Sequence, residues 1–297
     1  MCLSFSSNKL KSMFSDKIAV VTGATSGIGF STSLRLSSLG AQLVLVGRDE
    51  AKLEEIWSRC HEINKRENLK IRADFHVQDE AEKVIRETIN QFGRIDVLIN
   101  NAGIQKFGGI EETSTEEFDE VMIVDLRSVL CIIKEAVPHL IESKGVIVNV
   151  SSINGIRSFP GKLSYNVAKA GLDQLTRSVS LGESCEFLVL PFIVTCNRIR
   201  NNEDTFSFSY TDLAKYGIRC NSVNPGVIVT ELQKRAGLTD DEYEQYLERS
   251  KETHPLGRAG RADEVASAIV FLASDQASFI TGVCLPVDGG RHATCAH

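Results

Sequence analysis

The stretch Thr22-Gly-Ala-Thr-Ser-Gly-Ile-Gly29 decides the fold of this chain. It follows a β-branched run, Ile18–Thr22, and opens a segment of helical period. Glycines let the backbone turn tightly from strand to helix, and the free N–H groups at a helix N-terminus attract phosphate. Such a turn is weak evidence alone, but strand before and helix after is the context that a nucleotide-binding βαβ unit requires.

Working outward, short β-branched runs alternate with longer segments of helical period. The predicted strands are Ile18–Thr22, Gln42–Gly47, Ile71–Asp74, Val97–Asn100, Val146–Ser151, Arg219–Val223 and Val283–Val287. The predicted helices are Ile28–Leu39, Glu50–Asn64, Ala81–Gln91, Thr115–Leu140, Leu163–Leu181 and Ala262–Ala273. This alternation predicts one doubly wound α/β domain, with a parallel sheet of about seven strands covered on both faces.

Composition narrows the classes of partner. The 297 residues are 42% hydrophobic and 24% charged, with a net charge of −6, which is ordinary for a globular protein. This charge predicts no nucleic-acid or anionic-membrane partner, and no apolar run approaches the roughly 18 residues of a membrane span. The eight cysteines form no CxxC pair and have no histidine at metal-ligand spacing. We therefore expect no metal site, a reducing compartment and a cytoplasmic location.

Two segments stand apart from the predicted domain, which spans residues 14–297. Residues 1–13 are Ser-rich and basic, which is typical of a short tail and less so of a transit peptide. Residues 182–211 interrupt the helical pattern that joins Leu181 to Asp212, with Gly217 as the expected end of that helix. This atypical insertion is either a retained intron or a genuine surface loop.

The end of the second predicted strand indicates which dinucleotide would bind. An acidic residue there would accept hydrogen bonds from the adenosine ribose, whereas a basic one suits a 2′-phosphate. Here Gly47 is followed by Arg48, whose guanidinium can grip a phosphate with two hydrogen bonds. The position favours NADP over NAD.

Three residues form a candidate proton-transfer group. Tyr165 and Lys169 lie four residues apart on a predicted helix and so share one face. A free tyrosine has a pKa near 10, and a neighbouring ammonium lowers it by favouring the phenolate. Ser152 follows the strand Val146–Ser151, at the carboxyl edge where ligands of such sheets bind. Its hydroxyl can hold a substrate oxygen against the tyrosine.

Taken together and in order, these motifs resemble the classical short-chain dehydrogenase/reductase family, from about Lys17 to Gly290. The resemblance rests on Thr22–Gly29, Asn100-Asn-Ala-Gly103, Ser152, Tyr165 with Lys169, Asn224-Pro-Gly-Val-Ile-Val-Thr230 and the terminal Asp288-Gly-Gly290. It is greatest to the 3-oxoacyl carrier-protein reductase-like branch.

The resemblance implies a Rossmann fold, hydride exchange between NADP(H) and a carbonyl or alcohol, and a homodimer or homotetramer. It assigns catalysis to Ser152, Tyr165, Lys169 and the position of Asp125. The implied cofactor contacts are Gly23, Ser26, Gly27, Ile28, Gly29, Arg48, Asp74 beside the adenine, Asn101 near the ribose, Tyr165, Lys169, Ile228 and Thr230. The substrate pocket would draw on Gln105–Phe107, Ile153-Asn154, Phe159 and a lid at Asp240–Glu248.

Asp125 departs from the family pattern. The family carries an asparagine there, in a Val-Asn-Leu-like context, whereas this chain has Val124-Asp-Leu126. A carboxylate could pair with Lys169, raise the pKa of Tyr165 and slow turnover at neutral pH. The alternatives are therefore an NAD-dependent alcohol or steroid dehydrogenase, and a catalytically impaired cofactor-binding scaffold.

Overall fold

The computed structural model describes residues 13–77, 79–181 and 213–294. The predicted tail, apart from Met13, and the atypical insertion at 182–211 lie outside the described residues.

Seven parallel strands form one sheet, as predicted, in the order β3-β2-β1-β4-β5-β6-β7. Their bounds are β1 Ile18–Thr22, β2 Gln42–Gly47, β3 Leu69–Arg72, β4 Val97–Asn100, β5 Val146–Val150, β6 Arg219–Pro225 and β7 Cys284–Val287. The chain builds outward from β1 in one direction and then returns to add β4 on its other side. Ligands of such sheets bind where this reversal leaves a crevice at the carboxyl ends of the strands.

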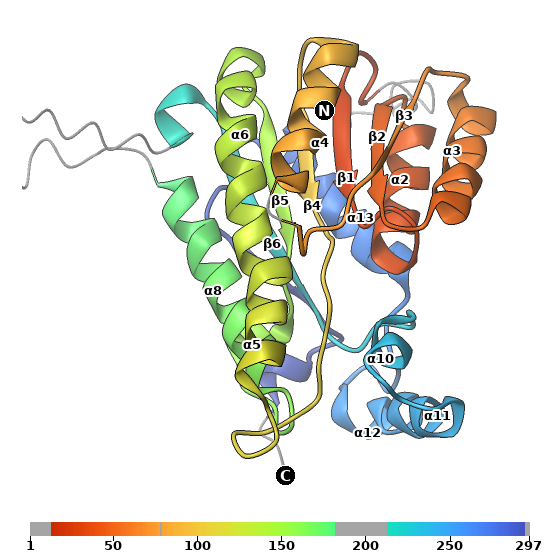
Figure 1. Cartoon of the computed structure of the whole chain (residues 1–297), viewed down its shortest axis with the longest axis vertical. Coiled ribbons are helices and arrows are strands. Elements are labelled where there is room, and N and C mark those ends of the chain that lie inside the picture. The colour runs from red at the N-terminus through yellow and green to blue at the C-terminus, as the bar shows by residue number, and fades with distance from the viewer. Residues whose placement is uncertain (1–12, 78, 182–212, 295–297) are drawn as a thin grey trace, which may run out of the picture.

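Helices cover both faces of the sheet (Figure 1). One face carries α2 (Gly27–Ser38), α3 (Glu50–Asn64) and α13 (Ala262–Ala273), whose buried side chains include Leu36, Ile56 and Ile269. The other carries α4 (Glu80–Phe92), α6 (Ser128–Ser143) and α8 (Leu163–Ser180), with Val84, Ile132 and Leu172 in its core. Burial on both faces explains why β1, β2, β4 and β5 are almost continuously apolar.

The predicted helix Thr115–Leu140 is helical throughout, but it is not one regular α-helix. It consists of α5 (Thr115–Met122), a π-helical turn η1 (Ile123–Arg127) and α6. A π turn makes the i→i+5 hydrogen bond, and apolar periodicity cannot reveal it because the pattern on either side stays helical. The consequence is local but important, because Asp125 lies within this turn.

Residues after the insertion also differ from the prediction of one long helix. Leu213–Tyr216 form a separate 3₁₀ turn, η2, next to α8, and Leu213 is buried. Gly217 ends this turn at φ +75°, in the left-handed conformation expected of a terminating glycine.

Short helices extend the carboxyl edge of the sheet. Beyond β6 lie α10 (Leu232–Arg235), α11 (Asp240–Glu248) and α12 (Ser250–Thr253), which stand below the strands in Figure 1. The short helix α7 (Ile153–Ile156) follows β5, and the 3₁₀ turns η3 (Asp275–Ala277) and η4 (Arg291–Ala293) flank β7. No helix of the described residues has both the length and the apolarity needed to cross a membrane.

Candidate active site

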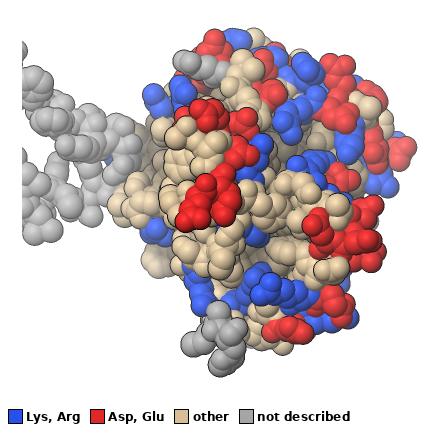
Figure 2. Space-filling model, turned by 60° about the horizontal axis from the view of Figure 1, so that its bottom comes forward, with Lys and Arg blue, Asp and Glu red and all other residues tan. Residues whose placement is uncertain are grey.

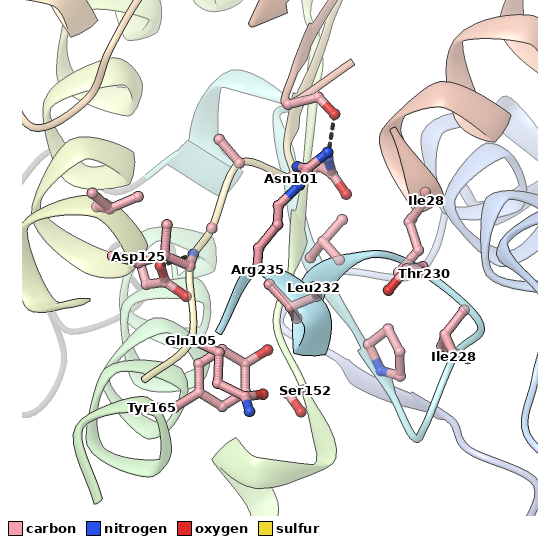
Figure 3. A pocket seen from close by; sticks show the side chains of 18 of the residues that line it. Ile28, Asn101, Gln105, Asp125, Ser152, Tyr165, Ile228, Thr230, Leu232 and Arg235 are labelled. Atoms are coloured by element: carbon pink, nitrogen blue, oxygen red, sulfur yellow. Dashed lines mark hydrogen bonds between the residues drawn. The ribbon is translucent and has the colours of Figure 1, made fainter. Parts of the chain in front are cut away.

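One pocket at the carboxyl edge of the sheet collects the predicted site residues (Figure 3). All of the predicted catalytic and cofactor-contact residues except Gly29 line it, whereas Lys106, Phe107 and Phe159 of the predicted substrate pocket do not. The catalytic and cofactor-contact residues that line it come from the turn after β1, the ends of β2 and β5, the segments after β3, β4 and β6, the π turn η1 and helix α8. Residues up to 207 positions apart in the chain, from Gly23 to Thr230, thus meet at the crevice that the strand order creates.

The turn after β1 needs its glycines. Gly23 and Gly27 have φ values of +64° and +54°, in the left-handed region that side chains disfavour. A Cβ atom on Gly29 would collide with the carbonyl oxygen of Gly23. Ser26 precedes α2 without a capping hydrogen bond from its side chain, so that side chain leaves the first N–H groups of α2 to other acceptors. This turn therefore fits a pyrophosphate.

Asn101 braces this turn from the neighbouring strand. Its side-chain Nδ2 donates to the carbonyl oxygens of Thr22 at 2.9 Å and Gly23 at 3.1 Å. Its backbone N–H donates to the Thr22 hydroxyl at 2.9 Å. Because the amide nitrogen is committed to the backbone, the structure gives Asn101 a positioning role at the pocket wall.

Arg48 and Asp74 line the pocket just beyond the ends of β2 and β3. Arg48 is exposed, and no carboxylate within the described ranges lies within 4 Å of it. Asp74 accepts from the imidazole Nδ1 of His76 at 2.8 Å. Burial raises the pKa of Asp74, but the hydrogen bonds and charge of His76, with Arg48, outweigh it and lower the pKa. Asp74 is thus engaged locally, while Arg48 faces the pocket.

Tyr165 and Lys169 stand on the inner face of α8. Tyr165 is 7% exposed and Lys169 is 3% exposed. The ammonium nitrogen of Lys169 lies 5.4 Å from the centre of the Tyr165 ring and donates to the carbonyl oxygen of Val150 at 3.1 Å. The helix spacing predicted a shared face, and the structure has it. An ammonium in a buried site interacts strongly with its neighbours because little water screens it.

Ser152 is held between backbone and side-chain partners. Its hydroxyl accepts from the backbone N–H of Asn154 and donates to the Asn154 side chain, both at 3.1 Å. Its carbonyl accepts from Asn224 Nδ2 at 2.8 Å, and the same nitrogen donates to Asp173 at 2.8 Å. Figure 3 shows Ser152 beside Tyr165.

Asp125 pairs with Lys169, as its sequence position made possible. The carboxylate is fully buried, and its Oδ2 lies 3.1 Å from Lys169 Nζ in an ion pair outside hydrogen-bond geometry. Its Oδ1 accepts from the backbone N–H of Ile104 at 2.7 Å. The absence of a side chain at Gly103 leaves room for the Asp125 carboxylate, since a Cβ atom on Gly103 would lie 3.1 Å from Oδ2 of Asp125.

Burial and charge together set the acidity of this group. Burial raises the pKa of Asp125 despite the nearby Lys169. Burial opposes the charge of Lys169, but Asp125 and Tyr165 outweigh it, so the pKa of Lys169 is raised. For Tyr165, burial raises the pKa, Lys169 lowers it and Asp125 raises it, with a net rise. Asp125 thus offsets part of the pull of Lys169 on the phenol.

The segment after β6 closes the pocket against the glycine turn. A Cβ on Gly27 would lie 2.9 Å from the methyl carbon of Thr230, so Thr230 packs directly on that turn. Tyr243 of α11 holds Thr230 in place by accepting from its N–H at 3.2 Å and donating to its carbonyl at 2.8 Å. Ile228 lines the same wall and is 6% exposed.

The structure also brings residues to the pocket that the sequence did not single out. Among these are Lys162, Gln233, Arg235 and Arg291, while Tyr246 comes from the predicted lid Asp240–Glu248. Only Lys162, three residues before Tyr165, had a positional signal, because one helical turn separates the two. Arg291 is 122 residues farther along the chain than Lys169, and no local pattern links it to the site. Among the residues described, no cluster of His, Cys, Asp and Glu could hold a metal ion.

Comparisons with known proteins agree with this geometry. The family model for short chain dehydrogenase matches residues 17–184, and the model for enoyl-(acyl carrier protein) reductase matches residues 210–292. The chain belongs to the short-chain dehydrogenase/reductase family. It is an NAD(P)-dependent oxidoreductase of that family and acts on carbonyl or alcohol substrates. Residues 185–209 fall outside both models.

Individual relatives span nearly the whole chain. An uncharacterized oxidoreductase of Thermotoga maritima is 34% identical over 281 residues, covering 94% of this chain and 99% of that protein. Meso-2,3-butanediol dehydrogenase of Serratia marcescens is 33% identical, covering 95% and 96%. A cofactor-containing short-chain dehydrogenase/reductase structure from Caenorhabditis elegans has a TM-score of 0.80 at 32% identity, covering 96% and 98%. Levodione reductase has a TM-score of 0.77 at 30% identity, covering 95% and 100%.

Proposed function

We propose that this enzyme interconverts a carbonyl and a secondary alcohol with NADP(H), and that Tyr165 is its general acid and base. The observation that carries the proposal is the buried Tyr165–Lys169 pair beside an uncapped, glycine-lined helix N-terminus in one pocket. When bound there, the nicotinamide supplies or accepts the hydride.

Each residue of the group has a distinct task in this proposal. Ser152 would turn its hydroxyl proton from Asn154 to the substrate oxygen and hold that oxygen near Tyr165. Tyr165 gives its phenolic proton to the same oxygen during reduction and takes it back during oxidation. Lys169, anchored on Val150, stabilises the phenolate that remains. Asn224 and Asp173 fix the backbone that carries Ser152.

Arg48 supports NADP as the preferred dinucleotide. It lines the pocket at the end of β2, where the ribose 2′ position of a bound dinucleotide falls in Rossmann domains. Its guanidinium has no carboxylate partner among the described residues, so it remains available to a phosphate. A comparison of NADPH and NADH as reductants separates this proposal from an NAD-dependent alcohol or steroid dehydrogenase.

A second candidate follows from Asp125. Because its carboxylate neutralises much of the field of Lys169, the chain could bind cofactor and turn over poorly, as a catalytically impaired scaffold. The test is oxidation of NADPH against a panel of ketones and aldehydes, with Tyr165→Phe in parallel. Turnover that disappears in the variant supports the enzyme, and turnover that survives refutes the assigned acid. NADPH binding without turnover of any carbonyl favours the scaffold.

We also propose that the enzyme is a cytoplasmic homodimer or homotetramer, joined through α5, α6 and α8. Leu130 on α6 and Val167 on α8 are each 41% exposed, so both helices present apolar side chains outward. Light scattering after size-exclusion chromatography measures the state directly. A monomer at micromolar concentration would refute this assembly.

The insertion at 182–211 is, in our proposal, dispensable for the fold. The described elements on either side of it, α8 and η2, contact one another, which supports a fold in which the two are joined without the segment. Sequencing the transcript decides between the two origins of the segment. A major message that contains it refutes the retained intron and leaves the surface loop.

A further inference from the structure

The pocket extends beyond Tyr165 into a region that the proposed chemistry does not use. Here it is lined by five residues from five segments of the chain, Gln105, Asn154, Lys162, Tyr246 and Arg291. On the corresponding face of the molecule, Lys and Arg side chains form a group below the centre (Figure 2). The charges in this region decide which substrates it can accept.

Lys162 is a cation in an unfavourable structural position. It precedes the first turn of α8, where the helix dipole favours negative charge, so the helix gains nothing from it. Its ammonium donates to the hydroxyl of Tyr246 at 3.3 Å and lies 5.2 Å and 5.7 Å from the ring centres of Tyr246 and Phe107. No carboxylate of the part of the chain described here lies within 4 Å of it. Among the described residues, Lys162 therefore has no ion-pair partner that neutralises its charge.

Arg291 reaches the same region from the C-terminal turn η4. Arg157 of the segment after α7 fixes that turn by donating to the backbone carbonyls of Arg291 at 3.5 Å, His292 at 2.9 Å and Thr294. The guanidinium of Arg291 lies 4.6 Å from the ring centre of Phe159, and burial lowers its pKa. Within residues 13–77, 79–181 and 213–294, no carboxylate lies within 4 Å of it either. Arg291 is thus a cation that lines the pocket on a turn fixed by Arg157.

Gln105 adds a buried donor with no acceptor. It is 4% exposed, and its Nε2 has no hydrogen-bond partner in the structure. Figure 3 shows its side chain next to Tyr165. Leaving a buried donor unsatisfied costs folding free energy, so this nitrogen is suited to an oxygen supplied by a ligand.

The acids that line the pocket do not offset these donors. Asp74 pairs with His76, Asp125 with Lys169, and Glu231 with Arg235 at 2.5 Å. Each of the three carboxylates is therefore engaged away from Lys162 and Arg291. The region beyond Tyr165 has an excess of positive charge and of donors.

We propose that the substrate is an oxo acid, or the corresponding hydroxy acid, whose anionic group binds to Lys162, Arg291 and Gln105 while its carbonyl meets Tyr165. This inference rests on the proposed function, because it places the reacting carbonyl at Tyr165. A carboxylate, phosphate or sulfonate offers the same oxyanion chemistry, and the carboxylate is the form tested.

Calorimetric titration of the protein saturated with NADP⁺ tests the inference without turnover, because a ketone cannot react with the oxidised cofactor. The probes are 3-oxobutanoate, 4-oxopentanoate and 5-oxohexanoate, each against its methyl ester, which keeps the carbonyl and removes the charge. We expect at least one acid to bind about tenfold more tightly than its ester. Equal binding of acid and ester at all three lengths overturns the inference.

Two variants assign the preference to its residues. Lys162→Met and Arg291→Met should each reduce the acid preference by about tenfold while ester binding stays unchanged. Lys134→Met, an exposed site on α6 outside the pocket, removes the same charge and should leave the preference intact. A preference that survives both pocket variants contradicts the assignment.

The same titrations distinguish the two levels of the proposal. If NADP⁺ binds and the acid preference is absent, the oxyanion site is wrong and the proposed function stands. If NADP⁺ fails to bind but the acids still bind more tightly than the esters, the proposed function is wrong and the oxyanion site stands.

Discussion

The two halves of the pocket differ in whether backbone or side chains form them. The half that we propose binds the cofactor, here called the cofactor half, is formed mainly by backbone: the left-handed glycines after β1, the N-terminus of α2 and the carbonyls that accept from Asn101. The catalytic half consists of buried side chains, in which Tyr165, Lys169 and Asp125 set one another's charge.

The difference determines how each half responds to change. In the cofactor half, most substitutions leave the backbone geometry unchanged. The exception is a glycine with no room for a Cβ atom. In a buried site, the pKa of each charged group depends on the charges of the others. A substitution that removes one charge therefore changes the behaviour of the whole group. We expect variants of the two halves to separate binding from chemistry.

The largest effect should come from Tyr165→Phe, which removes the acid from the catalytic half. Proton transfer by a positioned side chain contributes roughly 10²–10⁴-fold, so kcat should fall by that factor. The affinity for NADPH, measured by nucleotide fluorescence, should change little because the backbone cradle remains. A parallel loss of affinity would show that the two halves are not separable.

Gly29→Ala should damage the cofactor half instead. The new Cβ would meet the Gly23 carbonyl, which is backbone and cannot move aside. We expect a loss of roughly 1–3 kcal/mol in unfolding free energy and a similar loss in NADPH binding, measured by denaturant titration and fluorescence.

Gly93→Ala is the matched control for that variant. Unlike Gly29, which lies within α2, Gly93 is left-handed at φ +70°, and nothing lies within 4 Å of an added Cβ. It should cost about 1 kcal/mol of stability from backbone strain and leave NADPH binding unchanged. Equal losses of NADPH binding in both variants would contradict the steric argument.

Asp125→Asn should shift the pH dependence of catalysis. Removing the carboxylate removes a charge that raises the pKa of Tyr165, so that pKa should fall. Alcohol oxidation needs the phenolate and increases with pH up to that pKa, so its profile should move to lower pH and its rate at neutral pH should rise. Carbonyl reduction needs the phenol, so it should decline at lower pH in the variant than in the parent.

The control for that shift is Asp119→Asn, an exposed residue of α5 outside the pocket. It removes the same charge from the neighbouring helical turn and should leave both profiles in place. Superimposable profiles for Asp125→Asn and the parent would show that the buried carboxylate has no influence on the phenol.

Arg48→Gln should have the smallest effect, because the side chain is exposed and screened by solvent. We expect KM for NADPH to increase about tenfold, with KM for NADH unchanged. An equal change for both cofactors, or none for NADPH, would remove the basis for the NADP preference.

The same contrast explains what could be predicted from the sequence. The glycine turn and the strands follow from spacing and alternation, so the sequence predicts the sheet and the position of this turn within a few residues. β3 ends at Arg72 and not at Asp74. The helix spacing also predicted the shared face of Tyr165 and Lys169.

The sequence could not show features that depend on tertiary contacts. The π turn at Ile123–Arg127 leaves no periodic signal, although it carries Asp125. Lys162 and Arg291 line one pocket because Arg157 holds the C-terminal turn in place. The sequence alone cannot show that this region has an excess of positive charge, because that depends on the nearby acids being paired with other residues in the fold.

The most direct test of the account is the pKa of Tyr165 itself, with NADP⁺ bound. The phenolate absorbance of the parent minus that of Tyr165→Phe isolates this residue among the five tyrosines, and the same subtraction is made in the Asp125→Asn background. The account predicts that Tyr165 ionises at a clearly lower pH when residue 125 is asparagine. The same ionisation in both backgrounds would contradict the claim that the charge of Asp125 raises the pKa of Tyr165.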